Sequence, residues 1–157
     1  MTTIPSTADA AASPVASPHR ARLNILAAVI LLISIALPFV FLTNSASWAH
    51  AVFHILGIAT CIGGIAVQRG LRRGTTRAVT VLSWIVTVLL VGWLAGHVGE
   101  LSIVMNHGGL HADESVFSNP AHEFSAAIAV PSWALSVLAT IVLLATVGVQ
   151  ALRRRAK

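Results

Sequence analysis

The sequence predicts an all-α integral membrane protein, in which four transmembrane helices form an up-down-up-down bundle with both termini in the cytoplasm. The chain of 157 residues is 56% hydrophobic and only 10% charged, whereas soluble domains are about 25% charged. It contains four apolar windows of about 20 residues, the length that crosses a hydrocarbon core of ~30 Å. If each window spans the membrane, all ten basic residues fall on one side, which the positive-inside rule makes the cytoplasmic side.

The four windows and their connections occupy almost the whole chain, so we expect one membrane domain over residues 20–157. The predicted spans are residues 23–42, 48–68, 78–98 and 126–149. Residues 1–19 are rich in Ala, Ser, Thr and Pro, a composition that predicts a disordered cytoplasmic tail. The connections after the first and second spans are short, which favours antiparallel neighbours in a four-helix bundle.

The first span has an alternative interpretation as a signal peptide, cleaved near "SASWA" with small residues at Ser47 and Ala49. Its apolar run of about 20 residues is longer than the 7–15 residues of a typical signal-peptide core. We therefore expect a retained span, although the sequence alone leaves cleavage open.

The formal net charge of +5 is explained by topology and does not require nucleic-acid binding, because the basic residues flank the spans. They are Arg20, Arg22, Arg69, Arg72, Arg73, Arg77, Arg153, Arg154, Arg155 and Lys157. Four of the five acidic residues fall on the outer side, namely Glu100, Asp113, Glu114 and Glu123. This pattern predicts a multi-pass protein of the plasma membrane. The preference for Arg over Lys, with abundant Ala and Val, favours a GC-rich bacterial genome.

The connection on the outer side, residues 99–125, is the longest in the predicted bundle. Loops longer than about 12–15 residues are usually functional or disordered. Near its end, Ser118 or Asn119 followed by Pro120 predicts a helix N-terminus. We expect Pro131 to kink or break that helix.

Polar and small residues form one stripe along the second span. They are His50, His54, Gly57, Cys61, Gly64 and Gln68, spaced by 4, 3, 4, 3 and 4 residues. Residues at this spacing share one face of a helix, and a face of small and polar residues packs against protein and not against lipid. In the third span, Gly92 and Gly96 form a GxxxG motif that also predicts a close helix contact.

Histidine and acidic residues gather at the outer end of the bundle, and the segment 97–123 alone holds four of each. The second span runs inward, which places His50 and His54 roughly 3 and 9 Å below its outer end at ~1.5 Å per residue. The third span runs outward and ends near His97, with Glu100 one turn further. These four side chains are therefore expected to converge from two adjacent helices.

Imidazole and carboxylate groups together suit Zn, Cu or Fe, so the sequence predicts a metal site. The proposed ligands are His50, His54, His97 and Glu100, and the outer connection adds His107, His111, Asp113, His122 and Glu123 as capture or lid groups. A b-type haem held by His50 or His54 and by His97 is a second form of the hypothesis, although haem ligands do not explain the nearby acids.

Three functions fit these observations. The first is metal handling or electron transfer at a metal or haem site. The second is a non-catalytic accessory or assembly subunit that packs on other membrane proteins through its small-residue helix faces. The third is a pH-responsive transporter or sensor, because clustered His side chains titrate near pH 6.5. The absence of GxSxG, P-loop and Rossmann motifs disfavours an enzyme of those classes.

Overall fold

The computed structural model describes residues 18–41, 48–73 and 75–156, which form four long helices and two short 3-10 helices. In chain order these are α1 (Pro18–Phe41), α2 (Trp48–Leu71), α3 (Arg77–Asn106), η1 (Gly109–His111), η2 (Glu114–Ser118) and α4 (Pro120–Arg155). All four long helices are long and apolar enough to cross a membrane. The described part of the chain is therefore all-α and has the make-up of a multi-pass membrane protein.

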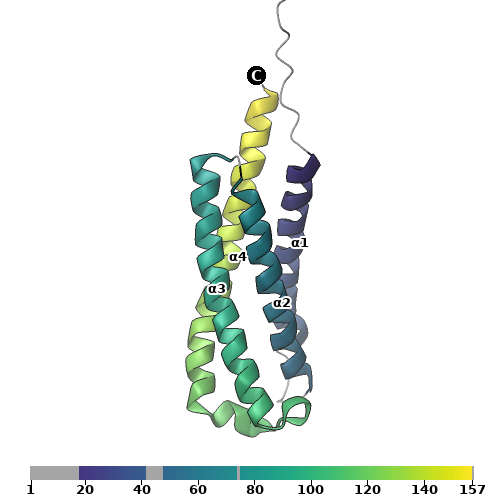
Figure 1. Cartoon of the computed structure of the whole chain (residues 1–157), viewed down its shortest axis with the longest axis vertical. Coiled ribbons are helices and arrows are strands. Elements are labelled where there is room, and N and C mark those ends of the chain that lie inside the picture. The colour runs from purple at the N-terminus through teal and green to yellow at the C-terminus, as the bar shows by residue number, and fades with distance from the viewer. Residues whose placement is uncertain (1–17, 42–47, 74, 157) are drawn as a thin grey trace, which may run out of the picture.

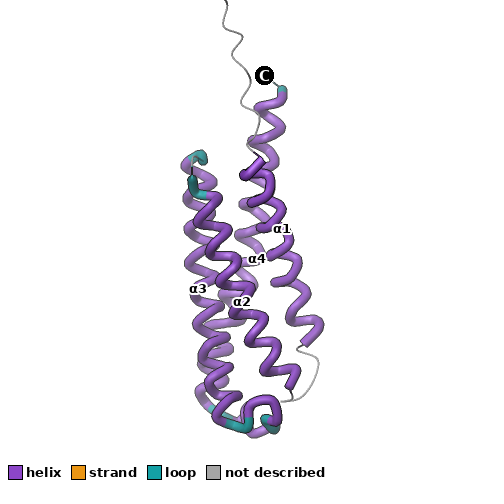
Figure 2. The backbone as a smooth tube through the Cα atoms, turned by 45° about the vertical axis from the view of Figure 1, so that its right-hand side comes forward, coloured by secondary structure: helices purple, strands orange, loops and turns teal. Residues whose placement is uncertain are grey.

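The long helices lie side by side in an elongated bundle (Figures 1 and 2). The start of α1 and the end of α4 lie at one end, and η1 and η2 lie at the other (Figure 1). Hydrogen bonds join the elements at the first end. The Arg20 guanidinium of α1 donates to the carbonyl of Arg73 over 3.0 Å, and the Gln150 amide of α4 donates to the Thr76 hydroxyl over 3.0 Å.

Large apolar side chains are exposed on the outer surface of every long helix. Examples are Leu32, Ile62, Val88 and Leu138, which are 56–66% exposed. In water, so much exposed apolar area would be unfavourable, whereas lipid chains solvate it at no cost. The surface of the bundle therefore matches a lipid bilayer.

Three small residues of α4 face three glycines of α3, where a close approach of the backbones is needed. The pairs are Gly92 with Ser132, Gly96 with Ala129, and Gly99 with Ser125. A Cβ placed at Gly96 would come within 2.5 Å of the Ala129 Cβ and 2.9 Å of its Cα. The predicted close contact at the GxxxG motif is therefore confirmed, and its partner is α4.

The observed helices extend into the predicted outer connection from both sides, and the start of α4 agrees with the helix N-terminus predicted at Ser118 or Asn119 and Pro120. α3 continues to Asn106, well beyond the predicted end at residue 98, and α4 begins at Pro120. The predicted loop 99–125 is therefore too long. Hydropathy marks where a chain leaves the lipid, but a helix continues until its backbone is diverted. Here the diversion occurs at Gly108 and Gly109, with φ of +103° and +61°.

The start of α4 follows the predicted capping pattern. The Asn119 side chain accepts a hydrogen bond from the Ala121 amide over 2.9 Å, and Pro120 occupies the first turn. The helix continues through Pro131, so the break considered there is absent. α1 begins at Pro18, inside the predicted tail 1–19, whereas the rest of that tail and the short connection after the first span, which includes Ser47, lie outside the described residues.

Candidate metal site and adjoining cavity

The polar stripe of α2 points into the bundle as predicted. All six of its residues are buried: His50, His54, Gly57, Cys61, Gly64 and Gln68. The spacing of 3 and 4 residues keeps them on the face that packs on the neighbouring helices. The two histidines occupy the first two turns of α2, at the end of the bundle that carries η1 and η2.

His54 lies between two other imidazoles. Its Nδ1 is 2.9 Å from Nδ1 of His97 in α3, and its Nε2 is 3.2 Å from Nε2 of His50. A neutral imidazole has one donor and one acceptor nitrogen, so His54 donates to one neighbour and accepts from the other. The three rings thus form a continuous hydrogen-bonded chain from α3 to the first turn of α2.

Gly57 provides the space for His97. A Cβ added at Gly57 would overlap the Nε2 end of the His97 ring, so the imidazole packs directly on the α2 backbone. His97 is 1% exposed, and no hydrogen-bond partner of its Nε2 is present among the described residues. Gly57 is therefore part of the site, because its missing side chain leaves room for the His97 ring.

Glu100 is held by a residue of α4. Its Oε2 accepts a hydrogen bond from His122 Nδ1 over 2.6 Å, and the Glu100 side chain is only 3% exposed. This short distance is typical of a charge-assisted hydrogen bond. The other carboxylate oxygen, Oε1, is buried and has no hydrogen-bond partner within the described residues.

His50, Glu100 and His122 form a group that could hold a metal ion. One ligand atom from each lies within 4.8 Å of the other two, and the three residues come from α2, α3 and α4. Two ligands on one ion at ~2.0–2.2 Å each lie at most about 4.4 Å apart. Small side-chain rotations therefore suffice to bring the three atoms onto one ion. Two imidazoles and one carboxylate are a donor set used for Zn and for non-haem Fe(II).

Aromatic rings surround this group. Phe117 of η2 lies 5.3 Å from the His50 ring and 5.2 Å from the His122 ring, measured between centroids. On the inner side, Phe53 lies 5.1 Å from the rings of both His54 and His97. The histidines are thus enclosed by apolar faces, which hold their orientation and limit contact with water.

A cavity of about 310 Å³ adjoins the metal-ligand group. Its lining consists of Pro38, Phe41, His50, Phe53, His54, Trp93, His97, Glu100, Phe117, His122, Ala126, Ala129, Val130 and Trp133. All four long helices and η2 contribute to it. Most of the wall is apolar, and the polar groups are the five histidine and glutamate side chains described above.

The other predicted ligands lie outside the group. His107 Nδ1 is 2.8 Å from the carbonyl of Ile103 at the end of α3, and His111 and Glu123 are exposed. Asp113 is the N-cap of η2, and hydrogen bonds from the Ser115 side chain and amide lower the pKa of its carboxyl group. Of the predicted outer groups, only His122 therefore joins the cluster of candidate ligands.

The direct contact of α2 with α3 disfavours a haem coordinated between His54 and His97. The His54 and His97 nitrogens face each other at hydrogen-bond distance, 2.9 Å. A macrocycle coordinated between them would require the two rings to separate by more than an atomic layer. The packing of His97 on Gly57 opposes that movement.

Sequence reasoning missed Phe117 and Trp133 as wall residues of the site. Phe117 stands as a single aromatic residue between the polar residues of "ESVFSNP", and Trp133 follows Pro131 inside an apolar span. An isolated aromatic residue in a polar connection indicates that it packs against another part of the protein. Only the fold shows which part that is.

Comparisons of this chain with protein-family models, curated proteins and solved structures found no match.

Proposed function

We propose that this protein binds one transition-metal ion between His50, Glu100 and His122, and that it acts in metal handling or electron transfer at the outer face of a bacterial plasma membrane. The observation that carries the proposal is the approach of three ligand atoms, within 4.8 Å of one another, from three different helices.

The burial of the group supports a ligand role over a surface role. His50 and Glu100 are 7% and 3% exposed, respectively. Ionisable side chains within a membrane-spanning bundle are costly and generally serve a function. A metal ion compensates that cost, because it supplies positive charge to the carboxylate and accepts electron pairs from neutral imidazoles.

The surroundings would orient the ligands. His50 makes a hydrogen bond to His54 through Nε2, and His54 in turn contacts His97. Such outer partners fix the tautomer and ring orientation of a ligating histidine. We therefore assign His54 and His97 to the support of the site.

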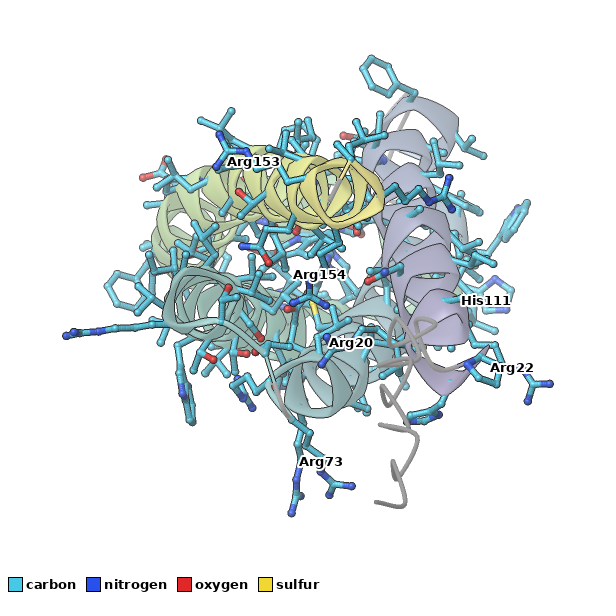
Figure 3. The ribbon with its side chains drawn as sticks, turned by 90° about the horizontal axis from the view of Figure 1, so that it is seen from above. Arg20, Arg22, Arg73, His111, Arg153 and Arg154 are labelled. Carbon is cyan, nitrogen blue, oxygen red and sulfur yellow. The ribbon has the colours of Figure 1, made fainter. Side chains whose placement is uncertain are left out.

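The topology proposed here is up-down-up-down, with both termini in the cytoplasm. It is supported by the contacts of Arg20 with Arg73 and of Gln150 with Thr76, which gather the basic ends of the helices. Arg20, Arg22, Arg73, Arg153 and Arg154 extend from α1, the α2–α3 turn and α4 around that end (Figure 3). The positive-inside rule then places the metal-ligand group at the opposite, outer end.

The test is elemental analysis of the untagged protein, purified from membranes in mild detergent. We expect about one equivalent of Zn, Fe or Cu per chain in wild type, lost in His50→Ala and His122→Ala. His111→Ala is the matched control, because His111 belongs to the same outer region but is exposed and lies outside the ligand group. Metal that is absent from wild type even after reloading, or equally retained in all variants, would refute the site and favour an accessory-subunit role.

A further inference from the structure

We propose that the 310 Å³ cavity binds a flat, lipid-soluble ring molecule that carries a hydroxyl group, of the quinol class, with Glu100 as its hydrogen-bond acceptor. The cavity extends beyond the metal-ligand group. A metal ion would leave this space largely unfilled.

The size and lining of the cavity fit such a ligand. A volume of about 310 Å³ lies at the lower end of the ~300–1,000 Å³ range of small-molecule sites, which are mostly apolar with a few polar groups. Phe53, Trp93, Phe117 and Trp133 present aromatic walls. Aromatic rings pack against one another at centroid distances of 4.5–7 Å, so these walls favour a planar ring over a flexible chain.

Glu100 determines the polar part of the ligand. Its Oε2 lies 2.6 Å from His122 Nδ1, so this oxygen already has a partner. Its Oε1 is buried, and the described residues provide it with no donor. A buried acceptor without a partner is costly, and a ligand hydroxyl that donates to Oε1 would remove that cost. The same oxygen offers nothing to an alkyl chain.

Access is from the lipid. Val130 lines the cavity, yet it is 60% exposed on the third turn of the membrane-spanning helix α4. The wall of the cavity therefore continues onto the lipid-facing surface beside α1. Two residues of α1, Pro38 and Phe41, belong to the same wall. A quinol dissolved in the bilayer would reach Glu100 from this side without crossing the polar connection.

The test uses duroquinol, a tetramethyl-substituted quinol without a side chain, under argon and with EDTA present. Binding is followed by the fluorescence of the tryptophans, because Trp93 and Trp133 line the cavity. Trp48 and Trp84 are 60% and 54% exposed and lie outside the lining. We expect saturable quenching that persists in Trp48→Phe and Trp84→Phe and is reduced in Trp93→Phe.

Two variants test the binding mode. Glu100→Gln replaces one carboxyl oxygen by an amide nitrogen, which donates and cannot accept, and should weaken duroquinol binding about tenfold. Ala126→Trp fills the cavity from α4, leaves Glu100 and the candidate ligands unchanged, and should abolish binding.

Three results would overturn the proposal. They are no saturable quenching in wild type, equal affinity in Ala126→Trp, or displacement of duroquinol by an equal concentration of hexadecane, which would identify the cavity as a site for lipid chains. Because the titration is performed in EDTA, failure of the metal site leaves this result unaffected, and failure here leaves the metal measurement unaffected.

Discussion

His122 Nδ1 of α4 lies 2.6 Å from Glu100 Oε2 of α3, and this contact joins the two helices across the connection formed by η1 and η2. The connection brings the chain back so that the first turn of α4 lies against the last turns of α3. A carboxylate that would otherwise be buried alone thus acquires a partner. The same contact places two of the three candidate metal ligands side by side.

Loss of His122 should destabilise the metal-free protein. In His122→Ala, Glu100 stays buried and loses its partner, so we expect the free energy of unfolding in EDTA to fall by about 1–3 kcal/mol. The double variant with Glu100→Gln should recover part of this loss, because a neutral amide costs less to bury than an unpaired carboxylate. The measurement is a denaturant titration in detergent. Additive effects of the two substitutions would contradict the coupling.

Gly57→Ala should disturb the site through His97. The added methyl group overlaps the imidazole, which must move or tilt, and overpacking of this kind costs about 1–3 kcal/mol. Gly148→Ala is the matched control, because a Cβ at Gly148 meets nothing within 4 Å. There the helix propensity of Ala should stabilise α4 by up to ~1 kcal/mol. Thermal unfolding of both variants compares the two effects, and equal midpoints would argue against the packing of His97 on Gly57.

Gly96→Ala should separate α3 from α4. The new Cβ would meet Ala129 at both its Cβ and its backbone, where no side-chain rotation can relieve the clash. Ala129→Gly removes the Cβ–Cβ part of that contact, so it should partly restore the thermal midpoint when combined with Gly96→Ala. A double-mutant cycle measures this coupling, and a coupling energy near zero would exclude the proposed helix contact.

The orientation in the membrane is testable with single cysteines. The natural Cys61 is fully buried, so the wild-type protein should give a low baseline with a membrane-impermeant maleimide. In intact cells, Leu110→Cys in η1 should react and Ala156→Cys after α4 should not. After permeabilisation both should react. Labelling of Ala156→Cys in intact cells would reverse the proposed topology.

Much of the fold was predictable from the sequence, because hydropathy and helical spacing report directly on lipid contact and on helix faces. The four spans and the inward stripe of α2 follow from these two signals. The end of α3 did not follow, since the helix backbone continues past the apolar window until Gly108 and Gly109 divert it, whereas the capping residues Asn119 and Pro120 marked the start of α4.

The sequence predicted most of the residues that gather at the candidate site, but not which of them contact each other. Convergence of His50, His54, His97 and Glu100 could be expected from depth along two helices. The choice of His122 among the outer histidines depends on where the first turn of α4 begins and on which side it faces α3. Those are properties of the connection, and no periodic pattern in the sequence encodes them.

X-ray absorption spectroscopy of the zinc-loaded protein tests the metal site most directly. We expect a first shell of nitrogen and oxygen at ~2.0–2.1 Å, with outer-shell scattering from two imidazoles in wild type and from one imidazole in His122→Ala. His111→Ala should give the wild-type spectrum. A sulfur shell at ~2.3 Å, or imidazole scattering that is unchanged in both His50→Ala and His122→Ala, would contradict a site formed by His50, Glu100 and His122.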